Sequence, residues 1–322
     1  MRSSLAAFSQ YSRVAEVVAK DIIRSYSSSF SLACRLLGEP VRTHIQNIYG
    51  MVRVADEIVD GAAAGANLTG ARILEVLDEY EHATFTAISD GFSPNPPLQA
   101  FANTARWAQL DAQHIRDFFH SMRLDAQSAT HPEPVAYDSA ATAQYIHGSA
   151  GVIGWMCNAV FTKTAQLNGN PLSEEEQTQA HMAAYSLGSA FQKVNFLRDY
   201  RHDSADLARI YLPQVAEEGL TDTAKSAIIR EIRDELSAAR EGVPLLPPQA
   251  RDGVQLAYDL FAELTNELER TPAAVIAHRR VRVPHHRKLR IAARVAREAT
   301  ARRFRPSTSP TESSSHPTHR GH

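Results

Sequence analysis

Helical periodicity, broken at intervals by proline and glycine, is the sequence feature that most constrains how this 322-residue chain can fold. Val14, Val18 and Ile22 lie at helical spacing, and the same pattern returns in most of the later segments. No two strand-like runs are joined by a hairpin signal, since the one Asn-Gly pair, Asn168-Gly169, lies between helical patterns. The sequence therefore predicts an all-α fold.

The breaks between these patterns are rich in glycine and proline, and they leave about seven to ten helical segments. They lie at 61–70, 93–97, 130–139, 168–173 and 242–249. Ser173 and Glu176 have the spacing of a capping box, in which two side chains satisfy the free amides at a helix start. Residues 305–322 have almost no apolar side chains. We therefore expect one helical domain at 1–304 and a disordered tail at 305–322.

Composition limits the environment of the protein more than its chemistry. Two cysteines, Cys34 and Cys157, exclude a disulfide scaffold and a cysteine-based zinc site, and they fit a reducing compartment. No apolar run approaches the roughly 18 to 20 residues of a membrane helix. The first residues also lack the continuous apolar core of a signal peptide. The sequence predicts a cytoplasmic globular protein.

Two short acidic segments about 140 residues apart are the strongest chemical signal in the chain. Asp56 and Asp60 lie one helical turn apart on one face, and Asp199 and Asp203 repeat this spacing, with Asn195 one turn earlier. Two facing helices with such pairs would form a carboxylate-lined cleft, which suits Mg²⁺ together with substrate phosphate. A single pair of this kind is also common on a solvated helix face, so each pair taken alone leaves both interpretations open.

Arginines accompany both acidic segments. Arg53 precedes the first pair, while Arg198, Arg201 and Arg209 surround the second. A guanidinium group matches the oxygens of a diphosphate in geometry and charge. The combination of carboxylates and arginines therefore favours a site for a metal-bound diphosphate.

At this point the chain resembles a known family, the phytoene and squalene synthases, which join two prenyl diphosphates head to head. It is most similar to the bacterial phytoene synthases, over roughly residues 20–300. The motifs that carry the resemblance are YSSSFSLACRLL at 26–37, YGMVRVADEIVD at 49–60, MRLD at 122–125, YIHGSAGVIG at 145–154, FQKVNFLRDYRHD at 191–203, RIYLP at 209–213 and RRVRVPHHRKL at 279–289. The resemblance implies a single-domain helical bundle of the isoprenoid-synthase type around a central apolar cavity.

The resemblance also implies roles for individual residues. Mg²⁺, with Mn²⁺ as the alternative, would be bound by Asp56, Asp60, Asn195, Asp199 and Asp203. Catalysis would use these aspartates with Arg53, Arg198, Tyr49 and Tyr211. The substrate diphosphates would be contacted by Ser27, Ser29, Arg53, Arg198, Arg209, Arg280, Lys288 and Tyr258. The substrate pocket would include Tyr145, Gly151, Gly154 and Gln192, although the two glycines have a second interpretation as sites of close helix packing.

Two positions depart from the family pattern. Ser28 stands where the family often has a lysine between two serines, so a phosphate-contacting cation is expected to be missing. Lys193 replaces a residue that is usually small or apolar, and we assign it no catalytic role.

The resemblance implies condensation of two geranylgeranyl diphosphates to phytoene through a cyclopropyl diphosphate intermediate, a step of carotenoid biosynthesis. The first alternative is a squalene or dehydrosqualene synthase that uses farnesyl diphosphate. NADPH is not expected, because the sequence has no glycine-rich dinucleotide fingerprint. A non-catalytic assembly factor of the same fold is the alternative from another class. Since such a factor should have lost its acidic residues, the four aspartates favour an enzyme.

A strongly basic segment lies near the end of the chain. Residues 279–305 contain eleven lysines and arginines and one acid, Glu298, a local charge of +10. Such a segment could contact anionic lipid, where each basic residue contributes about 1 kcal/mol. It could equally be a solvated helix whose first part contacts phosphate. We expect no nucleic acid partner, because no recognised nucleic-acid-binding motif accompanies the segment, and the oligomeric state is left open.

Overall fold

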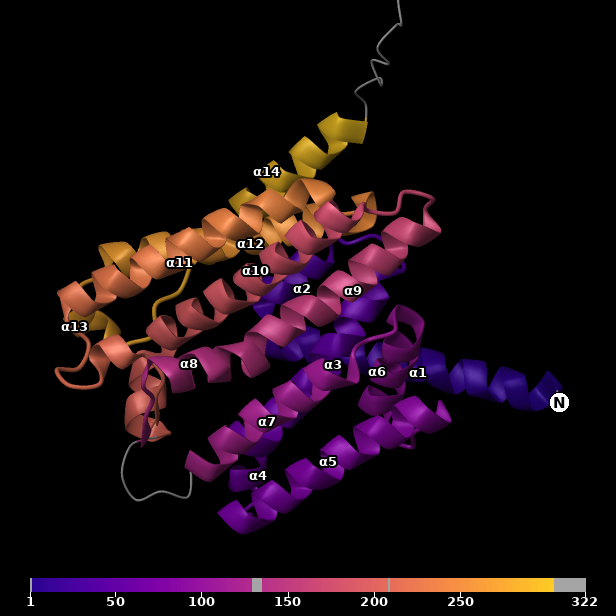
Figure 1. Ribbon diagram of the computed structural model, residues 1–322, viewed down its shortest axis with the longest axis horizontal. Helices are drawn as coiled ribbons and strands as arrows, with labels where there is room; N and C mark the ends of the chain where they lie inside the picture. Colours follow the sequence, from indigo (N-terminus) through magenta and orange to yellow (C-terminus); the bar gives the residue numbers. More distant parts are fainter. Residues whose placement is uncertain (1, 129–134, 208, 304–322) are drawn as a thin grey trace, which may run out of the picture.

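The computed structural model describes residues 2–128, 135–207 and 209–303, and these are helical almost throughout (Figure 1). The first half of the chain forms α1 (Arg2–Tyr26), α2 (Ser28–Cys34), α3 (Val41–Asp60), α4 (Ala62–Gly65), α5 (Gly70–Asp90), α6 (Pro96–Ala108), α7 (Ala112–Ser128), α8 (Ser139–Ile146) and α9 (Val152–Leu167). The second half forms α10 (Glu174–Arg201), α11 (Asp222–Gly242), α12 (Pro248–Arg270), α13 (Ala273–Ile276) and α14 (His285–Arg303). The prediction of an all-α bundle is confirmed.

Short elements join these helices. The π-helices η1 (His147–Gly151) and η2 (His202–Asp206) follow α8 and α10, and the 3₁₀-helices η3 (Pro213–Val215) and η4 (Val243–Leu245) flank α11. Two strands that the sequence did not reveal, β1 (Val135–Ala136) and β2 (Arg209–Ile210), pair in parallel. The predicted tail at 305–322 lies outside the described residues.

Polar side chains at the helix starts explain where several helices begin. The residues just before α5, α6, α8, α10 and α11 each accept a hydrogen bond from the amide three positions later; they are Thr69, Asn95, Asp138, Ser173 and Thr221. Ser173 and Glu176 form the predicted capping box in both directions. The breaks read from the sequence therefore coincide with real helix boundaries.

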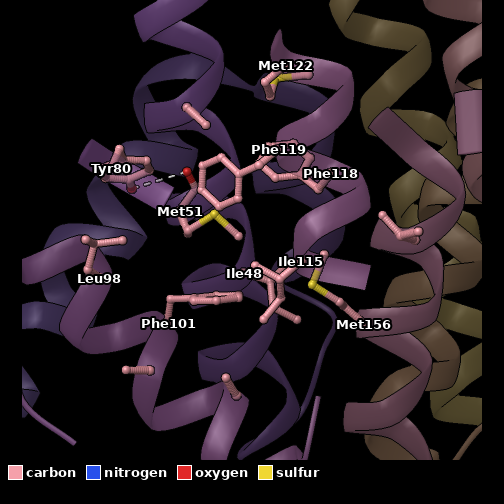
Figure 2. Close-up of a cluster of buried hydrophobic side chains, with 14 of the residues drawn as sticks. Ile48, Met51, Tyr80, Leu98, Phe101, Ile115, Phe118, Phe119, Met122 and Met156 are labelled. Atoms are coloured by element: carbon pink, nitrogen blue, oxygen red, sulfur yellow. Dashed lines mark hydrogen bonds between the residues drawn. The ribbon is translucent and has the colours of Figure 1, made fainter. Parts of the chain in front are cut away.

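A large apolar cluster fixes the position of α3. Ile48 and Met51 of α3 pack with Phe101 of α6 and Phe119 of α7, and the Tyr80 hydroxyl of α5 donates to the Met51 carbonyl at 3.4 Å (Figure 2). Each of these side chains is almost fully removed from water. Because this face of α3 is held by the core, the face that carries Tyr49, Arg53 and the first aspartate pair is turned toward α10 and β2.

The second half of the bundle is built around α10, which lies between α9 and α11 (Figure 1). A Cβ on Gly154 would come within 2.2 Å of the Ala184 carbonyl of α10, so the glycine allows these backbones to touch. Lys193 of α10 donates to Glu231 at 3.1 Å and to Glu235 at 3.0 Å on α11. These contacts make Lys193 a link between two helices.

The basic segment forms α14, which lies along α12 (Figure 1). Its apolar side chains, Ile291, Ala292 and Val295, pack against residues of α2 and α12. Arg294 donates to Asp259 of α12 at 2.8 Å. The apolar face of the basic segment is thus buried inside the protein, except for Leu289, which remains 63% exposed. Within the described ranges, no helix combines the length and apolar character required to cross a membrane.

Candidate functional site

The first acidic pair lies at the C-terminal end of α3 and is held by arginines. Arg53 donates to both Asp56 and Glu57, one turn further along the same helix. The Arg53 guanidinium also lies over the ring of Tyr26, 4.3 Å from its centre. Of the two aspartates predicted to bind metal here, Asp56 is therefore paired with a guanidinium of its own helix.

The second acidic pair lies where α10 passes into the π-helix η2. Arg198 Nε donates to Asp199 Oδ1 at 3.0 Å, and Arg280 Nε lies 2.6 Å from the same oxygen. Asp203 follows on η2, so the predicted spacing is kept although the helix type changes at residue 202. π-Helical turns often occur at functional sites, where they displace side chains from regular helical positions.

Electrostatic interactions show that the two pairs face each other. Burial, with the charges of Asp199 and Asp60, raises the pKa of Asp203 from 3.8 to about 8. Burial and the charge of Asp60 raise the pKa of Asp56 to about 6. Asp60 of α3 thus interacts both with its own pair and with Asp203 of η2. The structure therefore brings the two acidic segments close together.

A buried arginine joins the first pair to the rest of the bundle. The Arg209 side chain is 0% exposed, and its Nη1 donates to Asp60 Oδ1 at 2.5 Å. Asp125 of α7, which we did not predict as a site residue, lies beside it and accepts from Tyr145 at 2.5 Å and Tyr211 at 2.6 Å. Burial raises the pKa of Asp125 to about 7. The motif MRLD pointed to this aspartate, but its role depends on contacts made by residues far away in the sequence.

A group of cations lies beside the second pair and reaches the start of α2. Lys288 Nζ of α14 donates to Ser28 Oγ at 3.0 Å and to Ser29 Oγ at 3.1 Å. Its pKa is lowered by burial and by the charges of Arg198, Arg282 and Arg280, in that order. Arg282 was not predicted, although it lies between two predicted residues. Lys288 of α14 therefore places an ammonium group beside Ser28, where the family often has a lysine.

An apolar cavity of about 320 Å³ extends from this charged region along α10. At the charged end its wall includes Tyr49, Gln192 and Asn195. Further along α10 the lining residues are Phe191, Gly188, Leu187, Ala184, Ala183 and Ala180. From Asn195 to Ala180 the helix rises by about 22 Å at 1.5 Å per residue. The predicted central cavity is thus present and is long and narrow.

The remaining predicted residues lie at different distances from the cavity. Gly154 belongs to its wall, whereas Gly151 faces Tyr185, whose ring a Cβ would approach within 2.3 Å. Tyr145 lies behind the wall, against Asp125. Ser27 caps α2 by accepting from the Phe30 amide at 3.2 Å. Tyr258 of α12 packs in the second apolar cluster, where burial raises its pKa.

The donor set fits a cation that keeps part of its shell as water. Asn195 Oδ1 is buried at the charged end of the cavity and accepts no hydrogen bond from the described part of the chain. In the residues described, no three His, Cys, Asp or Glu side chains are close enough to hold a metal by themselves. Mg²⁺ is usually bound through one or two carboxylates with water and substrate phosphate. The two carboxylate pairs and Asn195 match this requirement better than that of a closed metal cage.

We expect the metal-free protein to lose stability as the pH rises from 6.5 to 8.5. The pKa of Asp203 is higher in the folded than in the unfolded chain, so the folded state binds this proton more tightly and the advantage is lost on ionisation. Asp203→Asn should weaken this pH dependence by about 2 kcal/mol. Urea unfolding of both proteins at the two pH values, without divalent metal, measures the difference. Equal pH dependence of stability in the two proteins would contradict the raised pKa assigned to Asp203.

The chain is similar to known proteins over most of its length. Residues 23–287 match the family described as squalene/phytoene synthase. Phytoene synthase of Arthrospira platensis is 28% identical over 84% of this chain and 88% of its own length. The chloroplastic phytoene synthase of Narcissus pseudonarcissus is 30% identical over 80% of this chain and 59% of its own length.

Longer relatives and solved structures extend the comparison. The bifunctional lycopene cyclase/phytoene synthase of Phaeosphaeria nodorum is 25% identical over 80% of this chain, which spans about half of that protein (46%). A crystal structure of a dehydrosqualene synthase in complex with ligand has the same fold, with a TM-score of 0.71 at 19% identity, covering 91% of this chain and 99% of its own. The family match includes both acidic pairs and the whole length of the cavity wall on α10. The chain belongs to the squalene/phytoene synthase family.

Proposed function

We propose that the chain joins two molecules of geranylgeranyl diphosphate head to head to form phytoene, through a cyclopropyl diphosphate intermediate. The observation that carries the proposal is the position of the charged groups. Two facing aspartate pairs and a group of cations lie at one end of a long apolar cavity. A prenyl diphosphate, with a charged diphosphate head and a linear chain of isoprene units, has this same division of charged and apolar surface.

The aspartates and Asn195 are the residues that would hold Mg²⁺, with Mn²⁺ as the alternative. The bound ion would supply positive charge that offsets the charge developing on the departing diphosphate. Asp56 and Asp199 are paired with arginines in the ligand-free chain. To bind a metal, these carboxylates have to exchange a guanidinium partner, and the released guanidinium can then contact the diphosphate.

The basic side chains would stabilise the leaving diphosphate, and the apolar cavity would protect the allylic carbocation that remains. Arg198, Arg280 and Lys288 are placed to bind diphosphate oxygens as negative charge accumulates there. The apolar wall excludes water, which would otherwise capture the allylic cation. After the second ionisation and rearrangement, loss of a proton from the final cation gives phytoene. That ending needs no NADPH.

A farnesyl-diphosphate-using synthase and a non-catalytic assembly factor are the two alternative functions. Farnesyl diphosphate as substrate would give squalene or dehydrosqualene, and the solved structure with the same fold is that of a dehydrosqualene synthase. Small residues in the far part of the cavity wall, Ala180 and Ala184, support the longer substrate, geranylgeranyl diphosphate. The four intact aspartates favour an enzyme over a non-catalytic assembly factor.

The substrate and the acidic pairs can be tested together. With Mg²⁺, purified protein should convert geranylgeranyl diphosphate to phytoene with or without NADPH, as measured by product chromatography. Asp56→Ala and Asp199→Ala should reduce turnover at least about 100-fold, because each removes a carboxylate needed at the diphosphate. Asp234→Asn, on the exposed face of α11, is the matched control and should keep normal turnover. If the protein converts only farnesyl diphosphate, the proposed substrate is wrong. If it forms no hydrocarbon from either substrate, the proposal that it is an enzyme is wrong.

Chain length can be tested in the cavity itself. Ala184→Phe places a ring in the far part of the wall, so it should lower kcat/KM for geranylgeranyl diphosphate relative to farnesyl diphosphate by about tenfold or more. Met182→Phe adds a similar bulk on the same helix at a position that is 66% exposed, and it should leave the ratio unchanged. If Ala184→Phe leaves the ratio as it is in the parent, the far part of the cavity does not hold the substrate chain.

The cation supplied by α14 gives a further prediction. Lys288→Ala should raise the Kd for inorganic diphosphate about tenfold, since it removes one charge-assisted hydrogen-bond donor. Adding Ser28→Lys to this variant returns an ammonium group to the same place and should recover most of the affinity. Arg290→Ala, elsewhere on the exposed face of α14, controls for the loss of charge alone. Titration calorimetry measures all four proteins. A double variant as weak as Lys288→Ala would show that the position of the cation is not interchangeable.

A further inference from the structure

Every nitrogen of the Arg209 guanidinium already has a partner within the protein. Nε donates to Ser128 Oγ at 2.7 Å, and Nη2 donates to the Asp125 carbonyl at 2.8 Å, both on α7. Nη1 donates to Asp60 at 2.5 Å and to the Tyr211 hydroxyl at 3.2 Å. The side chain is completely buried. Arg209 thus spans the distance between α7 and the end of α3.

The Asp125 carboxylate holds the Arg209 guanidinium in place. It is 1% exposed and lies 3.6 Å from Arg209 Nη1, close enough to balance the buried guanidinium charge. Its two oxygens accept from the hydroxyls of Tyr145 and Tyr211, so the carboxylate is held from both sides. A buried carboxylate with three such partners has little freedom to move.

The backbone of Arg209 is fixed as well. β2 pairs with β1 at Arg209, opposite Val135, and Thr142 Oγ1 of α8 donates to the Tyr211 carbonyl at 2.8 Å. The short strand pair, which the sequence did not reveal, therefore sets the position from which the side chain reaches Asp60. Both ends of the arginine are held before any ligand binds.

This geometry conflicts with a direct contact between Arg209 and a diphosphate, which the family resemblance implied. To reach a ligand, the guanidinium would have to give up its bonds to Ser128 and Asp125 and leave a buried carboxylate without its counter-ion. Breaking one partner out of a buried charge pair is strongly unfavourable. Arg198, Arg280 and Lys288, which are partly exposed around the cleft, meet the diphosphate requirement without this loss.

We propose that Arg209 is a positioning residue: anchored by Asp125 and Ser128, it orients the Asp60 carboxylate for metal binding and does not touch the diphosphate. The inference rests on the proposed role of Asp60 in the metal site. Residues that orient a metal ligand commonly change metal affinity by about 10- to 100-fold when they are replaced. Arg209 and Asp125 should therefore affect metal binding and diphosphate binding to different extents.

Two separate titrations test this difference. Inorganic diphosphate is titrated by calorimetry without divalent metal, and Mn²⁺ is titrated by electron paramagnetic resonance at saturating inorganic diphosphate. Arg209→Lys keeps the charge but loses the fixed fork of donors. It should weaken Mn²⁺ binding about tenfold and leave diphosphate binding within about twofold of the parent. Lys288→Ala is the matched control and should show the opposite pattern, with weaker diphosphate binding and unchanged Mn²⁺ binding. An Arg209→Lys protein that behaves like Lys288→Ala would overturn the proposal.

Milder variants cover the case in which Arg209→Lys does not fold, as judged by thermal unfolding. Ser128→Ala removes only the acceptor of Nε, and Asp125→Asn keeps the shape of the anchor without its charge. Each should weaken Mn²⁺ binding in the same direction without changing diphosphate binding, and unchanged Mn²⁺ binding in both would overturn the proposal. These outcomes are independent of the product. If the variants lose Mn²⁺ affinity and the parent protein makes no hydrocarbon, the positioning role is retained and the proposed function is rejected. If the variants keep Mn²⁺ affinity and the parent protein makes phytoene, the proposed function is retained and the positioning role is rejected.

Discussion

The crowding of carboxylates in a partly buried cleft is the constraint on which the rest of the site depends. Burial makes the Asp56 and Asp203 carboxyls costly to ionise, and the neighbouring charges of Asp60 and Asp199 add to this cost. Guanidinium groups from three parts of the chain offset this cost. They belong to Arg53 of α3, Arg209 of β2 and Arg280 in the segment before α14. Since these arginines come from distant parts of the sequence, their positions require most of the bundle to be in place.

The fold and the two acidic pairs could be read from the sequence because both depend on local spacing. Apolar residues at helical intervals predicted the bundle, and aspartates four positions apart predicted a shared face for each pair. Asp125 could not be assigned in this way. Its role arises from hydroxyls on Tyr145 and Tyr211, 20 and 86 positions away, and from the pairing of β1 with β2. Strands of two residues leave no periodic signal to read.

Two sequence patterns had more than one physical explanation, and tertiary contacts decided between them. Gly154 borders the cavity, yet its missing Cβ is also what lets α9 approach the Ala184 carbonyl of α10. The basic residues of α14 suggested contact with lipid, but the apolar side chains Ile291 and Val295 of this helix pack against α2 and α12. A stripe predicts burial without saying against what. In α14 this burial has a consequence for the site, because it fixes the helix so that Lys288 reaches Ser28.

The pairing of carboxylates with arginines also links metal and diphosphate in the proposed reaction. Asp199 is shared by Arg198 and Arg280, so its oxygens are not free for a metal while both guanidiniums remain on it. In the proposed reaction, a diphosphate that attracts these guanidiniums would free the carboxylate, and a metal that attracts the carboxylate would free the guanidiniums. Each ligand would then lower the cost of binding the other, and by linkage the two effects would be equal. Arg209 takes no part in this exchange, because its partners on α7 hold it in place. A site built this way keeps one carboxylate oriented while the other changes partners.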